Sequence, residues 1–445
     1  MKKLLSILIY LIVSVMLMAV VGCTPAPTPP PTPQPSLPAG KIATRENIGF
    51  ITGPDYFVGE NKDTTKFGFA GTDLGFPLWD STRERMLVFF GDTFSEHKVE
   101  TGKGWVSNIV GATTDLDLSN GIDWDGWLTK DGISNYSDEQ QQVVEVAKSF
   151  QKEYDEKTKI PTGAVEIDGT IYMFYFSKYS WSIKIDSMNY GGCVKSINGG
   201  NTWQRVYDLT WVNHATGTNS KYGLEAKKGE GTSAENIQEL VNKDNTLDVN
   251  GGNINIADHE GYFFTQIFPI DGKDGYIYIF GEGGYRTHGI KLGRVKKENI
   301  EIFDEYEYFC GNVNGEPTWQ KGIAGLRACC DSDKAFILGD KESVIGEHSV
   351  AYNPYLQKWM LTYLEGGVGV SWAYSKNIWG PYIKKGALIP YTWEDLPKWE
   401  EKPVTTLYGG FIHEKWMEQN GKVMYCAYSQ YFPIYNSSIM KITFM

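Results

Sequence analysis

The sequence lacks the features that mark several common protein classes. It has only 6 cysteines in 445 residues, too few for a disulfide-stapled scaffold. Lys and Arg number 42 against 54 Asp and Glu, for a net charge of −12. With no long basic run, the chain is not expected to bind nucleic acid, because phosphate neutralisation needs clustered Lys and Arg. Nucleotide-binding glycine loops and the common zinc motifs are also absent, so we expect no cofactor and no catalytic metal.

Aromatic residues and glycine, in contrast, are plentiful. Phe, Trp and Tyr make up 14% of the chain, and there are 49 glycines. Aromatic residues favour strands, and glycine favours the turns between them. The composition therefore predicts an all-β protein.

The long hydrophobic run lies at the N-terminus. Leu4–Val21 is almost wholly apolar, follows a short basic start and ends in a VVGC sequence at Cys23. This resembles a bacterial lipobox, which predicts a signal peptide over residues 1–22, a lipid on Cys23 and attachment to the bacterial membrane at the cell surface. A simple membrane-spanning anchor is the alternative. Proline is so dense in Thr24–Gly40 that residues 23–40 are expected to form a stiff, extended linker.

From residue 41 to 445 one hairpin pattern recurs five times. Each copy has a first strand that begins with a polar residue, a turn rich in Asp, Asn or Gly, and a strongly apolar second strand. The copies are Thr72–Asp92, Pro161–Ser177, Phe263–Gly283, Gly346–Gly366 and Tyr408–Gln430. Five similar hairpins without long helices between them predict a five-bladed β-propeller. A pair of β-sandwiches is the alternative, but it does not explain the shared internal pattern.

Two segments are too long for the repeat and are predicted to be insertions. Tyr136–Lys159 contains a capping-box sequence at Ser137–Gln140 that predicts a short helix. Lys221–Asp258 is polar and Gly-rich, and is expected to be loop with a helical turn at Ala234–Val241.

Polar residues near the start of each first strand are the candidate site. In a propeller the first strands line the central channel, so these side chains should converge on one funnel. Counted back from the turns, they are Asp73, Thr162, Gln266, Glu347 and His413. Two carboxyl groups in one cavity can cleave a glycosidic bond as base and acid. We expect Asp73 to be the ionised base and Glu347, in apolar surroundings, to be the acid.

Further residues near these strands complete the prediction. Asp92 is the third catalytic candidate, as a group that tunes the acid or holds a sugar hydroxyl. Arg286 and His348 are candidates for substrate binding, together with Thr162, Gln266 and His413. The acidic loop Asp115–Asp125 could hold a structural calcium ion, but a solvated loop is favoured because its spacing does not match an EF-hand.

Several of these segments resemble a known family. TDLGFPLWD…FFGDTF, PTGAVEIDGTIYMFY, IYIFGEGGYR, GEHSVAYNPYLQKWMLTY and YGGFIHEKW are similar to domain-of-unknown-function family 4185, part of which is classed as glycoside hydrolase family 183, the endo-D-arabinanases. The resemblance implies a five-bladed propeller that hydrolyses α-linked D-arabinofuranose chains such as those of mycobacterial arabinogalactan and lipoarabinomannan. By motif position, Asp73 and Glu347 match the catalytic pair that we would assign to the family.

The sequence therefore predicts a surface-anchored, monomeric glycoside hydrolase that acts on a polysaccharide with inversion at the anomeric carbon, and the family resemblance implies an arabinan as that polysaccharide. Two alternatives stay open. A glycan-binding lipoprotein without catalysis would need only the funnel. A sialidase-like enzyme would need an arginine cluster, for which the seven arginines of the chain are a poor source.

Overall fold

The computed structural model describes residues 40–54, 58, 62–98, 102–135, 141–150, 156–181, 187–213, 234–393, 396 and 406–445. Residues 39–445 form one compact unit. The predicted signal peptide, Cys23, nearly all of the Pro-rich linker and the capping-box segment Ser137–Gln140 lie outside the described residues. Neither α-helix among the described residues has the length and apolar content needed to cross a membrane.

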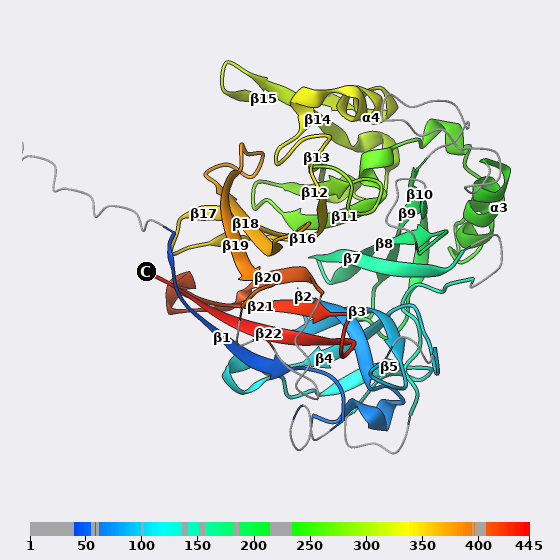
Figure 1. Ribbon diagram of the computed structural model, residues 1–445. Coiled ribbons are helices and arrows are strands. Elements are labelled where there is room, and N and C mark those ends of the chain that lie inside the picture. Colours follow the sequence, from blue (N-terminus) through cyan, green and yellow to red (C-terminus); the bar gives the residue numbers. More distant parts are fainter. Residues whose placement is uncertain are drawn as a thin grey trace, which may run out of the picture. The chain divides into compact units, whose positions relative to one another are not determined.

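Five antiparallel sheets make up this unit, and they are the blades of a five-bladed β-propeller (Figure 1). The first blade contains β2 (Gly71–Asp80), β3 (Arg85–Phe94), β4 (Ile109–Thr113), β5 (Gly126–Thr129) and β6 (Gly132–Asn135). The second contains β7 (Thr158–Ile167), β8 (Thr170–Lys178), β9 (Met188–Ser196) and β10 (Gln204–Val212). The third contains β11 (Gln266–Asp271), β12 (Tyr276–Glu282), β13 (Lys291–Lys296), β14 (Glu307–Val313) and β15 (Glu316–Lys321).

The last two blades complete the ring. The fourth contains β16 (Ile345–Asn353), β17 (Lys358–Glu365), β18 (Gly369–Ser375) and β19 (Ile383–Pro390). The fifth contains β20 (Leu407–Glu418), β21 (Val423–Gln430), β22 (Asn436–Phe444) and, as its outer strand, β1 (Ile42–Phe50). Because β1 pairs with β22, the two ends of the propeller chain are joined in one sheet.

The innermost strands of the five blades contact one another in a closed circuit, in the order β2, β7, β11, β16, β20 and back to β2. Each predicted hairpin corresponds to the first two strands of a blade, so the predicted five-bladed propeller is confirmed. The turn between β7 and β8 shows why the sequence folds in this way. Asp168 and Gly169 both have positive φ (48° and 82°), which suits the twist of a tight hairpin.

The second strand of each blade is buried on both faces. In β3 and β12, for example, every residue after the first is buried, because neighbouring blades cover both sides of these strands. Their continuous apolar sequence therefore satisfies both faces of the sheet, and a hydrophobic core extends through the blades.

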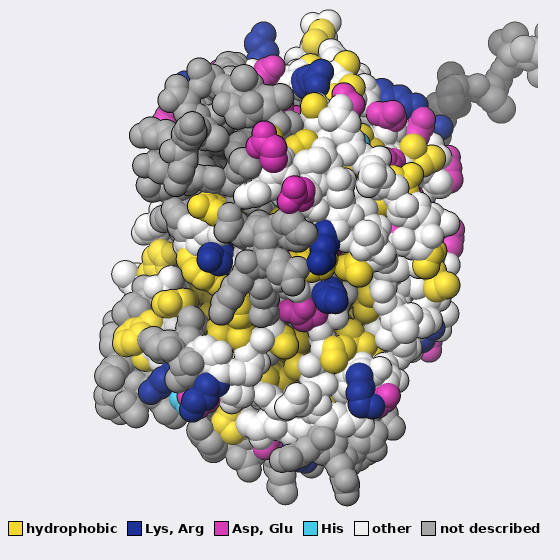
Figure 2. All heavy atoms as spheres, turned by 90° about the vertical axis from the view of Figure 1, so that its right-hand side faces the viewer, with side chains coloured by type: hydrophobic (Ala, Val, Ile, Leu, Met, Phe, Trp, Pro, Cys, Tyr) yellow, Lys and Arg dark blue, Asp and Glu magenta, His cyan; other side chains and the backbone are white. Residues whose placement is uncertain are grey.

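The second predicted insertion contains a helix longer than expected, α3 (Ala234–Asn245), and the residues before position 234 are not described. A helix in the third blade, α4 (Gly322–Asp331), was not predicted. The described parts of the first insertion, residues 141–150 and 156–159, contain no helix, and its last two residues begin β7. On the molecular face in Figure 2, basic and acidic side chains are interspersed over the described parts.

Candidate active site

The site begins at an irregularity between β2 and β3. Thr72 pairs with Thr93 and Leu74 pairs with Phe90, so a single residue, Asp73, faces the pair Gly91–Asp92. Such a β-bulge changes the direction of the side chains around it. An added Cβ at Gly91 would lie 2.4 Å from Asp73 Oδ1. The absence of a side chain at Gly91 therefore lets the Asp73 carboxyl lie beside the strand that carries Asp92.

Asp73 is 8% exposed and is held by tyrosines of the fifth blade. The Tyr408 hydroxyl donates to Asp73 Oδ2 at 2.9 Å. Burial and the charge of Asp92, with a smaller contribution from Glu347, raise the pKa of Asp73 to about 8, against hydrogen bonds from Tyr435 and Tyr408 that lower it. Asp73 is therefore mainly protonated at neutral pH.

Asp92 is 6% exposed but has stronger hydrogen-bond support. Its Oδ1 accepts hydrogen bonds from Trp105 Nε1 at 2.8 Å and from Thr158 Oγ1 at 2.7 Å. Burial raises the pKa of Asp92 to about 6, while these hydrogen bonds and the charge of Lys178 limit the rise. At neutral pH Asp92 is therefore mainly ionised, although it lies beside Asp73.

An arginine enters the same region from the third blade. Arg286 Nη2 lies 2.6 Å from Glu347 Oε1, and Arg286 Nε lies 3.1 and 3.2 Å from the two Glu347 oxygens. The guanidinium carbon is 4.8 Å from the centre of the Tyr285 ring and 5.0 Å from that of Tyr408. Tyr285 and Arg286 both have positive φ (52° and 65°), a conformation that costs free energy outside glycine and is found at functional sites.

Another buried carboxyl group lies close to this ion pair. Glu282, at the end of β12, is fully buried and accepts hydrogen bonds from the backbone N–H groups of Arg286 and Thr287. Burial and the charge of Glu347 raise the pKa of Glu282 well above its ordinary value. Glu282 thus fixes the strained backbone at Arg286, while Glu347 fixes the guanidinium.

Several of these groups border a cavity of about 520 Å³, a size typical of small-molecule sites. Asp73, Asp92 and Arg286 are the charged residues that line it. Its remaining lining is mostly aromatic and apolar, and consists of Phe94, Ile160, Trp181, Tyr285, Thr406, Tyr408, Tyr431 and Tyr435. The cavity therefore combines two carboxyl groups that differ in protonation with a fixed cation and several aromatic rings.

A comparison with protein families agrees with the sequence motifs. The model of the family described as domain of unknown function DUF4185 matches residues 58–441. The chain belongs to the DUF4185 family. No curated protein matches the sequence.

Solved structures are similar to this DUF4185 chain in fold. A protein of Bacteroides ovatus with a provisional hydrolase name is 13% identical, covers 85% of this chain and 87% of its own, and has a TM-score of 0.51. A family 117 glycoside hydrolase of Zobellia galactanivorans is 9% identical over 90% of this chain and 91% of its own, with a TM-score of 0.43. The RS223 β-xylosidase is 10% identical over 85% and 93%, with a TM-score of 0.42.

All five polar residues predicted for the DUF4185 funnel lie on the first strands of their blades, but they differ in environment. Asp73 lines the cavity. Glu347 is not among the lining residues, since both of its oxygens face Arg286. Thr162 Oγ1 donates to the Ile267 carbonyl and so joins the second and third blades. Gln266 is buried on β11, opposite Glu282.

The two predicted histidines do not line the cavity. His348 is buried, with Nε2 3.1 Å from the Phe280 carbonyl oxygen, and burial lowers its pKa to about 4. The predicted position of His413 is wrong. It lines a separate cavity of about 260 Å³ at the other end of the first strands, with Trp79 and Lys273 among its neighbours. Strand β20 has 12 residues and two register shifts. The residue at the funnel end of this strand therefore lies about five positions before His413.

Tyr408 occupies the position in the fifth blade that the sequence analysis assigned to His413. Tyr435, Tyr285 and Trp181 also line the cavity and were not predicted. The YGGF sequence that contains Tyr408 opens the fifth hairpin and was a usable signal. Trp181 and Tyr435 lie in connections outside the repeated hairpins, where no pattern pointed to them.

No group of His, Cys, Asp or Glu side chains within the described ranges has the arrangement of a metal site. In the acidic loop, Asp115 instead accepts hydrogen bonds from the backbone N–H groups of Asp117 and Asp123. The Asp115 carboxylate, which could have been a calcium ligand, is thus used in hydrogen bonds within the loop.

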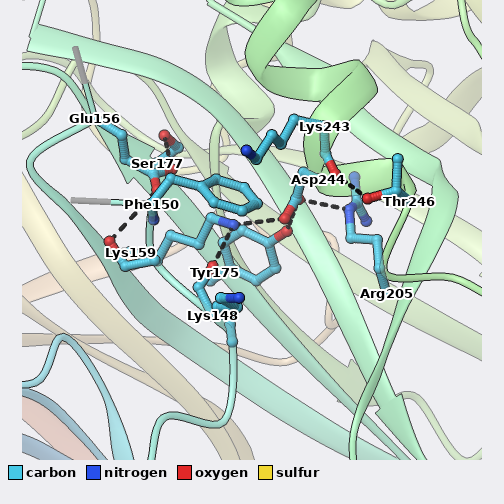
Figure 3. A network of polar contacts seen from close by, with 12 residues as sticks. Lys148, Phe150, Glu156, Lys159, Tyr175, Ser177, Arg205, Lys243, Asp244 and Thr246 are labelled. Carbon is cyan, nitrogen blue, oxygen red and sulfur yellow. Dashed lines mark hydrogen bonds and ion pairs between the residues drawn. The ribbon is translucent and has the colours of Figure 1, made fainter. Parts of the chain in front are cut away.

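A buried ionic network anchors the insertion helix next to the site (Figure 3). Asp244 of α3 lies 2.5 Å from Lys159 Nζ and 2.8 Å from Arg205 Nε, and all three side chains are at most 2% exposed. Burial alone would raise the pKa of Asp244, but the charges of Lys159 and Arg205 lower it. Lys159 follows Thr158, the residue that holds Asp92. The network therefore fixes the start of β7, from which Thr158 supports the site.

Proposed function

We propose that this protein is a glycoside hydrolase in which Asp73 and Asp92 act as acid and base on a polysaccharide. The observation that carries the proposal is the placement of these two carboxyl groups in one cavity, with pKa values of about 8 and about 6. A pair of carboxyl groups whose environments separate their pKa values can supply one proton and accept another at the same pH.

The reaction follows from this difference in protonation. Asp73 gives its proton to the glycosidic oxygen as the bond to the anomeric carbon breaks. Asp92 takes a proton from a water molecule that attacks that carbon on the face opposite the leaving oxygen. The proposed reaction therefore inverts the configuration, and it requires room for this water molecule between the two carboxyl groups. Exchange of protons with solvent then restores the starting state. This assignment reverses the role expected for Asp73 from the sequence, because burial and the neighbouring Asp92 favour its neutral form.

Arg286 and Glu347 have supporting roles in this proposal. The Arg286 guanidinium lines the cavity and can donate hydrogen bonds to sugar hydroxyls. Glu347 has both oxygens engaged by Arg286, so it orients the arginine and is not assigned as the acid. The carboxylate of Glu347 also contributes to the raised pKa of Asp73.

We propose D-arabinan as the substrate because the sequence resembles the endo-D-arabinanases within the family. The lipobox at Cys23 supports a lipid-anchored enzyme that meets this polysaccharide at the cell surface. Aromatic side chains in the cavity suit the apolar faces of sugar rings.

A glycan panel tests the proposal. The purified protein is incubated with D-arabinan, L-arabinan and other plant and bacterial glycans, and new reducing ends are measured, with Asp73→Asn as the control. We expect release from D-arabinan by the unchanged protein and no measurable release by the variant. Binding of a glycan without any release would instead support the alternative of a non-catalytic glycan-binding lipoprotein.

A further inference from the structure

Two aromatic side chains of the cavity are unusually accessible. Trp181 is 56% exposed and Tyr431 is 49% exposed, yet both line the same cavity as Asp73 and Asp92. A single exposed aromatic ring is common on protein surfaces, but these two rings lie at one concave site. A flat ring at the edge of a glycan site can stack on the apolar face of a sugar while its polar atom faces solvent.

Each exposed ring is linked to one of the two carboxyl groups. The Trp181 ring centre lies 6.1 Å from that of Trp105, and Trp105 donates its indole hydrogen bond to Asp92. The Tyr431 ring centre lies 6.0 Å from that of Tyr435, whose hydroxyl interacts with Asp73. The aromatic surface thus approaches Asp92 from one side and Asp73 from the other.

The order of the blades supports this arrangement. Trp181 follows β8 in the second blade, and Tyr431 follows β21 in the fifth blade. The first blade, which carries Asp73 and Asp92, lies between them, because β2 contacts both β7 and β20. The two rings therefore flank the carboxyl pair from neighbouring blades on opposite sides.

We propose that Trp181 and Tyr431 are substrate-binding residues that stack on sugars on either side of the scissile bond. An extended glycan chain then crosses the cavity, with bound sugars on both sides of the carboxyl pair. This inference rests on the proposed function and adds to it the residues that select a polymer. Trp105 and Tyr435, by contrast, act through the carboxyl groups that they contact.

Kinetics on two substrates of the same sugar test the proposal. Trp181→Ala and Tyr431→Ala are each expected to raise KM for the polysaccharide at least fivefold, with kcat within twofold of the unchanged protein. KM for a short aryl glycoside should change less than twofold. Phe432→Ala is the matched control, because Phe432 is exposed beside Tyr431 but is not among the residues that line the cavity. Unchanged polymer KM in either variant would overturn the two-sided arrangement.

Gel electrophoresis through immobilised glycan separates this proposal from the proposed function, since it needs no catalysis. The unchanged protein should be retarded, each alanine variant should lose most of the retardation, and the Phe432 control should keep it. Retardation that depends on both rings, without hydrolysis by the unchanged protein, supports the stacking residues and contradicts the hydrolase. Hydrolysis with retardation unchanged in the variants contradicts the stacking residues alone.

Discussion

Removal of one hydroxyl group, by Tyr408→Phe, probes the acid directly. Tyr408 donates to Asp73 Oδ2 at 2.9 Å, and this hydrogen bond favours the ionised carboxylate. The phenylalanine ring can still pack against Arg286, whose guanidinium lies 5.0 Å from the Tyr408 ring centre. The variant thus removes the hydrogen bond while it keeps most of the packing.

The size of the effect follows from the free energy of the hydrogen bond. A hydrogen bond to a charged group contributes about 1.5–3 kcal/mol, and one pKa unit corresponds to about 1.4 kcal/mol. Loss of the Tyr408 hydroxyl should therefore raise the pKa of Asp73 by about 1 to 2 units above its value of about 8. Because the acid must be protonated, the alkaline limb of the pH profile should move to higher pH by the same amount.

The assay is kcat/KM for the glycan substrate between pH 4 and pH 10. The unchanged protein should give a bell-shaped profile with limbs near pH 6 and pH 8, which belong to the carboxyl pair as a whole. Tyr425→Phe is the control, since its hydroxyl donates to Glu418 in the same blade. An unmoved alkaline limb in Tyr408→Phe would refute the reasoning. An acidic limb that moves upward instead would assign Asp73 as the base.

Three further predictions concern stability and stereochemistry. The folded-state pKa of Asp73 is raised from its ordinary 3.8 to about 8, so the stability of the protein falls as pH rises through this range. The Tm of Asp73→Asn should therefore exceed that of the unchanged protein by more at pH 8 than at pH 5. An equal difference at both pH values would contradict the raised pKa. Asp244→Ala leaves Lys159 and Arg205 buried without their counterion and should lower the free energy of unfolding by about 3–5 kcal/mol. Lys103→Ala, at a surface ion pair, should change it by about 1 kcal/mol or less. Similar losses for the two variants in a denaturant titration would contradict a larger contribution of the buried network to stability. Proton NMR of the first product should show an inverted anomer, and an initially retained anomer would contradict direct attack by water.

The sequence was sufficient to predict the propeller because each blade repeats the same local signals. Apolar second strands and turns such as Asp168–Gly169 depend only on nearby residues. The positions of Asp73 and Glu347 at the starts of first strands followed from that repeat. The closing strand β1, which joins the fifth blade at its outer edge, had no such signal because its partner β22 is almost 400 residues away in the chain.

The chemistry of the site was harder to predict, because protonation depends on neighbours in space. The sequence gives no indication that Arg286 engages both oxygens of Glu347, or that a bulge brings Asp73 beside Asp92. The expected acid is thus paired with a cation, while the expected base has the raised pKa. His413 was misplaced because the length of β20 and its register shifts interrupt the count along the strand.

The most direct test of the central claim, that Asp73 and Asp92 together cleave a glycosidic bond, compares kcat for three variants on one glycan. Asp73→Asn and Asp92→Asn should each lower kcat by at least about 100-fold, the lower end of the effect of general acid–base groups. Asp271→Asn, at the other end of the first strands, should leave kcat within twofold. Retention of more than a tenth of the activity by either Asp73→Asn or Asp92→Asn would contradict the account.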